Sequence, residues 1–87
     1  IYSVDESVGR VMRTLEEMGA ADNTAIFFTA DNGGVSSREW RNRQITSNAP
    51  LRLGKGHLYE GGIRVPTLVR WPGVTKPGSR SGEPIYT

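Results

Sequence analysis

The 87-residue sequence contains no cysteine, which excludes a disulfide, a thiolate zinc site and a cysteine nucleophile within it. No apolar run approaches the ~20 residues that a membrane-spanning helix needs, so we expect no membrane span. The basic stretches lack an RNA-binding aromatic motif, zinc-ligand spacing and a basic helix. We therefore expect no nucleic-acid partner.

The chain is too short to build a large core. A single domain of this size buries only a modest fraction of its surface. We expect it to be part of a longer domain. It would then need the remainder of that domain, or self-association, for stability.

Charge is distributed unevenly along the chain. Residues 38–80 hold nine basic residues and only two acidic ones, whereas residues 1–37 hold six acidic residues and two basic ones. The basic stretch favours anionic ligands. A solvated arginine-rich loop, with Arg38, Arg41, Arg43 and Arg52 on its surface, is an equal alternative.

The clearest predicted element is a helix over residues 3–18. Its apolar residues recur at helical spacing, from Val4 to Met18. Ser3 with Glu6 fits a capping box at the start, and Gly19 fits a left-handed stop at the end. The helix has one apolar face to bury against a sheet or another helix.

Two apolar, β-rich runs predict strands over residues 24–30 and 65–71. Between them lies a predicted active-site loop over 31–64, with a short helical turn near Ser37–Asn42, and residues 72–87 form a polar tail. The nearly continuous apolar character of 24–30 favours a strand covered on both faces. This order predicts an α/β fold with a mostly parallel sheet flanked by helices.

Asp31 and Asn32 follow the first predicted strand directly. Ligands bind beyond the carboxyl ends of strands in open α/β sheets, and calcium and magnesium prefer oxygen ligands. Gly33 and Gly34 let the chain turn so that both side-chain oxygens converge. The pair is a candidate metal site, although Asp-Asn-Gly-Gly is also a common turn sequence.

Lys55 lies between two glycines, Gly54 and Gly56, which allow backbone and ammonium to approach an anion closely. A flexible turn with an exposed lysine is the alternative. His57, the only histidine, is a candidate hydrogen-bond donor or base beside that anion. Glu60 and Arg64 are expected to pair and fix the loop.

Taken together, four segments resemble the sulfatase family of the alkaline phosphatase superfamily. They keep the family's order and spacing, and the resemblance covers nearly the whole chain: Phe28–Gly34 (FTADNGG), Pro50–Gly56 (PLRLGKG), Leu58–Pro66 (LYEGGIRVP) and Arg70–Gly73 (RWPG). The resemblance implies an alkaline-phosphatase-like sandwich and places the chain in the C-terminal portion of the arylsulfatase-like catalytic domain.

The resemblance also implies roles for individual residues. Asp31 and Asn32 would be ligands of a calcium ion, with magnesium as the alternative, and Lys55 would be a catalytic residue that contacts sulfate. In the family a formylglycine, made from a cysteine or serine in a Cys/Ser-x-Pro-x-Arg signature, attacks sulfur. That signature is absent here, so the chain alone should be inactive.

Two other functions remain open at this stage. A phosphodiesterase or phosphonate hydrolase of the same superfamily would use a similar tetrahedral anion, and a non-catalytic oxyanion-binding fragment would bind without turnover. The expected substrate is a sulfate ester, and the basic residues favour a sulfated carbohydrate. Similar bacterial proteins are commonly exported, so a periplasmic or extracellular parent protein is expected.

Overall fold

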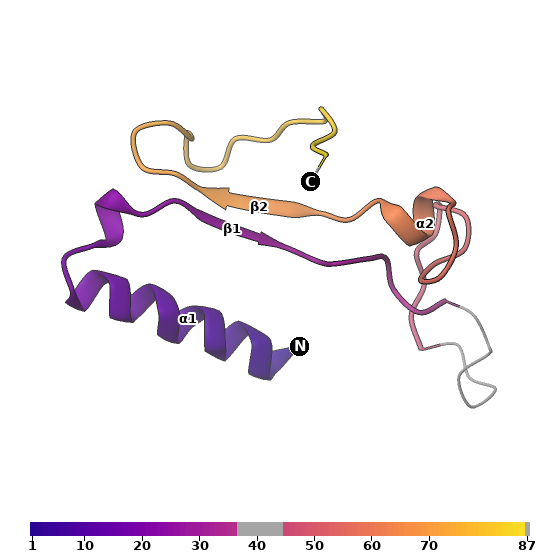
Figure 1. The fold of residues 1–87 in the computed structure, drawn as a ribbon, viewed down its shortest axis with the longest axis horizontal. Coiled ribbons are helices and arrows are strands. Elements are labelled where there is room, and N and C mark those ends of the chain that lie inside the picture. Colours follow the sequence, from indigo (N-terminus) through magenta and orange to yellow (C-terminus); the bar gives the residue numbers. More distant parts are fainter. Residues whose placement is uncertain (37–44, 87) are drawn as a thin grey trace. The chain divides into compact units, whose positions relative to one another are not determined.

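The computed structural model describes residues 1–36 and 45–86. They form two compact units, residues 1–26 with 69–87, and residues 27–68. The Ser37–Asn42 turn, and the predicted surface arginines Arg38, Arg41 and Arg43, lie outside the described residues. Figure 1 shows the elements, which are α1 (Tyr2–Glu17), the 3₁₀ turn η1 (Ala21–Asn23), β1 (Ile26–Thr29), α2 (Glu60–Ile63) and β2 (Thr67–Arg70).

The helix predicted over residues 3–18 is observed as α1, Tyr2–Glu17. Gly19 has a left-handed φ of 66°, and its N–H donates to Glu16 O at 3.0 Å while Ala20 N donates to Leu15 O at 2.9 Å. This is a Schellman stop, as predicted. The predicted capping box is wrong, because the helix begins one residue before Ser3, and Ile1 caps it without a side-chain hydrogen bond.

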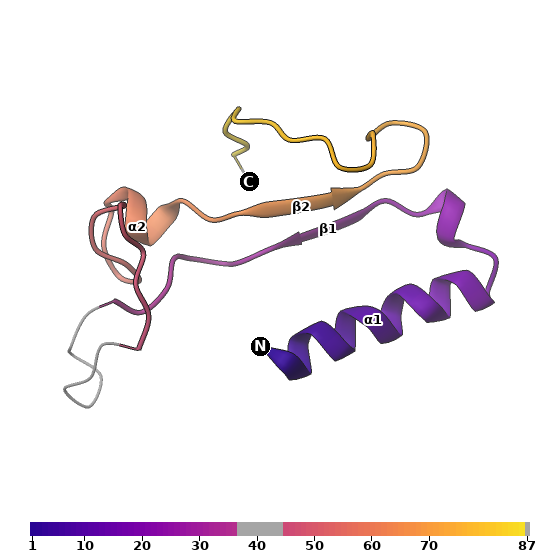
Figure 2. The same ribbon diagram turned by 180° about the vertical axis from the view of Figure 1, so that it is seen from behind.

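The two strands form a two-stranded sheet and run antiparallel (Figures 1 and 2). Thr29 Oγ1 donates to Pro66 O at 3.1 Å, and Thr67 Oγ1 donates to Thr29 Oγ1 at 3.2 Å. The end of β1 is thus held to the start of β2, which is hairpin geometry and not a parallel crossover. The prediction that β1 belongs to a parallel pair is not met by these strands, and a mostly parallel sheet in the parent domain stays a prediction.

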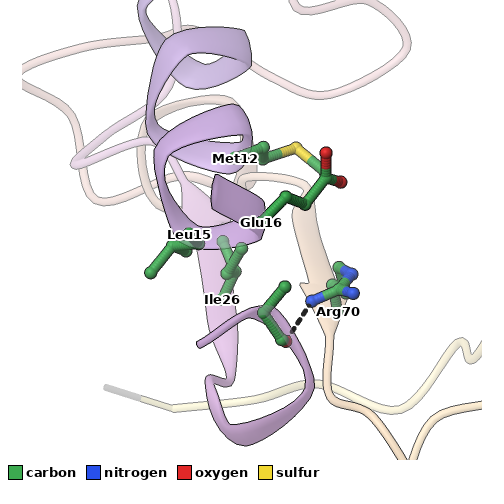
Figure 3. Close-up of a pocket in the computed structure, with 6 residues that line it drawn as sticks. Met12, Leu15, Glu16, Ile26 and Arg70 are labelled. Carbon is green, nitrogen blue, oxygen red and sulfur yellow. Dashed lines mark hydrogen bonds between the residues drawn. The ribbon is translucent and has the colours of Figure 1, made fainter. Parts of the chain in front are cut away.

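The first unit packs the second half of α1 over the start of β1. Met12, Leu15 and Glu16 line a shallow depression together with Ala21, Ile26 and Arg70 (Figure 3). Arg70 Nη1 donates to Ala21 O at 2.7 Å, which ties η1 to the end of β2. The depression is a packing seam, and the predicted site residues lie in the other unit.

Apolar side chains of the described residues are not collected into a core. None of them is buried, and Phe27, Phe28 and Leu68 are 58%, 42% and 66% exposed. The first strand was predicted to be packed against other elements on both faces, and residues 1–36 and 45–86 do not provide that packing. Across these same ranges, no helix combines the length and apolarity that crossing a bilayer would require.

We predict that the isolated 87-residue chain does not unfold cooperatively. Because none of the apolar side chains in residues 1–36 and 45–86 is buried, too little surface leaves water to offset the entropy of ordering the chain. Thermal circular dichroism should show a gradual loss of signal, and a hydrophobic dye should bind at low temperature. A sharp monomeric transition that does not depend on protein concentration would contradict this.

Candidate functional site

All four predicted site residues lie in the second unit, residues 27–68. The buried residues among those described are all glycines, and all belong to this unit: Gly33, Gly54, Gly61 and Gly62. The interior of this unit is therefore formed by main chain against main chain. Side chains, including the candidate functional ones, lie around it.

Hydrogen bonds between main-chain groups join three segments of the loop. Gly33 N donates to Gly62 O at 2.9 Å, and Lys55 N donates to Gly34 O at 3.1 Å. Gly61 N donates to Arg52 O at 3.0 Å. We call residues 52–57 the lysine turn. Together with the turn at Gly33 and Gly34 and with α2, it forms one cluster, which we call the glycine cluster.

The glycine cluster leaves no room for side chains at several positions. A Cβ on Gly33 would overlap the carbonyl oxygen of Gly61. A Cβ on Gly62 would overlap the carbonyl oxygens of His57 and Gly54. Glycine at these positions therefore allows one main chain to approach another closely.

Asp31 and Asn32 precede the cluster directly. The Asp31 side chain is exposed, and Asn32 Nδ2 donates to Gly33 O at 2.9 Å. Because a carbonyl oxygen only accepts, this bond fixes which end of the Asn32 amide faces the chain. The Asn32 Oδ1 atom is thereby left for another partner, and within the described residues no hydrogen bond to it is found.

The lysine turn carries Lys55 and His57. Lys55 is exposed, and within residues 1–36 and 45–86 its ammonium has no ion-pair partner. His57 is half-buried, with its N–H and Nδ1 at 3.1 and 3.3 Å from Gly54 O. Because that carbonyl must accept, Nδ1 carries the hydrogen and Nε2 is left for an external group.

Two further side-chain pairs lie on the surface of the cluster. Arg64 Nη1 donates to Glu60 Oε2 at 3.1 Å, which confirms the predicted pairing one turn apart. Both side chains are more than half exposed, so this pair contributes little stability. The Arg52 guanidinium lies 3.9 Å from the centre of the Tyr59 ring, a stacking arrangement that orders this arginine.

The structure brings together the backbones of the predicted residues and does not by itself complete a metal site. Within the described part of the chain, no group of three or more His, Cys, Asp or Glu side chains is placed to hold a metal ion. The sequence did not indicate Asn48, whose side chain forms hydrogen bonds with Gly34 in one turn and Leu53 in the other. An asparagine in a loop gives no periodic or compositional signal that would have identified it.

Comparison with known proteins places the chain in a family. A family model described as Sulfatase matches residues 1–86. The chain is 44% identical to a steryl-sulfatase of Rattus norvegicus over 97% of its length, and 43% identical to a sulfatase of Formosa agariphila over 87%. It is 40% identical to an N-acetylgalactosamine-6-sulfatase of Homo sapiens over 93%.

The matched segment is a small part of each relative. The chain spans 15% of the rat protein, 14% of the Formosa protein and 15% of the human one. The predicted placement in the C-terminal portion of the catalytic domain is not borne out by these matches. Membership is nevertheless shown over nearly every residue, and the chain belongs to the sulfatase family.

Proposed function

We propose that this chain forms part of the active site of a sulfuric ester hydrolase, to which it contributes metal-binding and sulfate-binding residues. Family membership supports the reaction class. The observation that carries the assignment of residues is the hydrogen bond from Lys55 N to Gly34 O, 3.1 Å long. It joins the lysine turn to the turn that carries Asp31 and Asn32.

Asp31 and Asn32 fit a hard divalent cation. An exposed carboxylate and an amide oxygen turned away from its own chain are suitable ligands for Ca²⁺, with Mg²⁺ as the alternative. Calcium takes about six to eight oxygen ligands, so these two would be joined by groups from the rest of the domain. A bound cation would polarise a sulfate oxygen and stabilise its charge.

Lys55 and His57 would bind the sulfate group. An ammonium without an ion-pair partner among the described residues is a compact charge that is available to a tetrahedral anion. His57 Nε2 is the free end of a ring whose Nδ1 is held by Gly54 O. It would contact an oxygen of the sulfate ester.

The nucleophile would come from outside these 87 residues. No serine here begins the family's nucleophile signature, and there is no cysteine. A formylglycine in the parent protein would supply the attacking oxygen. This chain's residues would hold the anion and stabilise charge that develops on it, and we expect no turnover by the chain alone.

The parent α/β domain would be an alkaline-phosphatase-like sandwich that covers the exposed faces of α1 and β1. Its substrate would be a sulfate ester, with a sulfated carbohydrate favoured by the basic loop. The names of the relatives point to both sterol and amino-sugar sulfates and do not choose between them. The parent protein would act in the periplasm or outside the cell.

Replacing Lys55 with alanine in the full-length protein tests this proposal. We expect hydrolysis of an aryl sulfate ester to fall at least about tenfold, because a charge that stabilises the transition state is removed. Lys76→Ala, at an exposed lysine of the other unit, is the matched control and should leave the rate unchanged. Equal rates for both variants would rule out the role assigned to Lys55. A preference of the unmodified protein for phosphate esters would favour the phosphodiesterase alternative.

A further inference from the structure

The Asn48 side chain makes three hydrogen bonds to main-chain groups. Its Oδ1 accepts from Gly34 N at 3.1 Å, and its Nδ2 donates to Gly34 O at 2.8 Å and to Leu53 O at 3.0 Å. Its side chain therefore uses both ends of the carboxamide. It lies in the loop, partly exposed.

These bonds connect the two turns that carry the proposed ligands. Gly34 lies two residues after Asn32, and Leu53 lies two residues before Lys55. Gly34 O also accepts from Lys55 N at 3.1 Å, so one carbonyl serves both the lysine turn and Asn48. Asn48 therefore bridges the turn that follows Asp31 and Asn32 and the lysine turn.

The backbone at Leu53 shows that this turn is held under constraint. Leu53 has φ of 60°, a left-handed conformation that is unfavourable for a side chain branched beyond Cβ. Such a residue persists when its surroundings fix it, and functional sites often contain them. The bond from Asn48 Nδ2 to Leu53 O is one of the contacts that fix it.

The chemistry of the site requires a carboxamide. The side chain must accept from one N–H while it donates to two carbonyl oxygens. Aspartate has the same shape, but it cannot donate when ionised and would face both carbonyls with negative oxygens. Alanine removes all three bonds.

We propose that Asn48 is a positioning residue that fixes Lys55 relative to Asp31 and Asn32. The inference rests on the proposed function, because its effect on the rate passes through those residues. If Asn48 is lost, we expect Lys55 to be misplaced relative to the sulfate group, in addition to any decrease in the amount of folded protein. Misplacement of a charge by about an ångström can cost as much as about a hundredfold in rate.

A double-mutant cycle in the full-length protein tests this inference, with an aryl sulfate ester as substrate and kcat measured per folded molecule. We expect Asn48→Ala to lower kcat about tenfold. The double variant should have a kcat no more than about threefold below that of Lys55→Ala alone. The effects of two substitutions on the activation free energy are not additive when one residue acts through the other. Asn48→Asp should behave like Asn48→Ala.

Asn23→Ala is the matched control, because Asn23 is an exposed asparagine in the other unit. It should leave kcat unchanged alone and should not alter the effect of Lys55→Ala. If Asn48→Ala leaves kcat intact, or if its effect multiplies fully with that of Lys55→Ala, the inference is overturned while the proposed function stands. If neither Asn48 variant folds, the residue is structural and the inference is overturned as well. If Lys55→Ala itself has no effect, the proposed role of the lysine fails first.

Discussion

Replacing Gly61 with alanine is expected to remove most of the activity of the full-length protein and to lower its melting temperature clearly. A Cβ at this position would overlap the carbonyl oxygens of Leu53 and Arg52, which are main-chain atoms and cannot rotate away. The lysine turn or α2 must therefore move. Overpacking that displaces backbone costs about 1–3 kcal/mol, and occasionally more.

Gly82→Ala provides the control for this substitution. A Cβ on Gly82 meets nothing within 4 Å, and Gly82 lies in the polar tail. Its melting temperature and turnover should match those of the unmodified protein. Differential scanning calorimetry and an aryl sulfate assay on the two variants measure the difference. A Gly61→Ala protein that melts and works normally would show that the close backbone contact is not required.

Removal of the Asp31 carboxylate should have the second large effect. If Asp31 is a ligand of the cation, Asp31→Ala should lower turnover about a hundredfold or more at fixed calcium, because the Lewis acid is bound less tightly and placed less well. Excess calcium should restore part of the rate. Titration of turnover with calcium after chelation gives the apparent affinity.

Asp5→Ala removes an equally exposed carboxylate, from the first turn of α1. It should change neither the turnover nor the calcium titration. An Asp31→Ala protein with an unaltered calcium titration would contradict the ligand role of Asp31. Loss of turnover with unchanged calcium dependence would indicate that this carboxylate acts on the substrate instead.

The helix was predictable from the sequence because its signals are local. The apolar stripe and Gly19 gave α1 and its Schellman stop, within one residue at each end. The start was misjudged because Ser3 and Glu6 form a capping pattern that the helix does not use. An N-terminal cap depends on one side-chain hydrogen bond, and the free N–H groups of the first turn can be satisfied by water instead.

The direction of the strands was not predictable in the same way. The sequence located β1 and β2, but a loop of more than 30 residues between them is long enough for a parallel crossover or an antiparallel return. The bonds from Thr29 to Pro66 and from Thr67 to Thr29 decide the antiparallel return. Such contacts join residues far apart in sequence and leave no periodic trace.

The hydrogen bonding that builds the candidate site was only partly predictable from the sequence. The pairing of Glu60 with Arg64 followed from residue type and spacing. The role of Asn48 depends on three partners in two separate turns. The functions of Asp31, Asn32, Lys55 and His57 stay predictions until the variants are measured.

The glycine cluster has a consequence for attempts to change the substrate of this protein. Contacts between main-chain groups at the glycines determine the shape of the cluster. Side chains that point outward from it are therefore not needed to keep that shape. Leu58 and Ile63 are 92% and 59% exposed on the same segment. If the lysine turn binds the substrate anion as proposed, a library that varies these two positions, with the glycines and Asn48 kept, would change side chains on the same loop while the main-chain arrangement is kept.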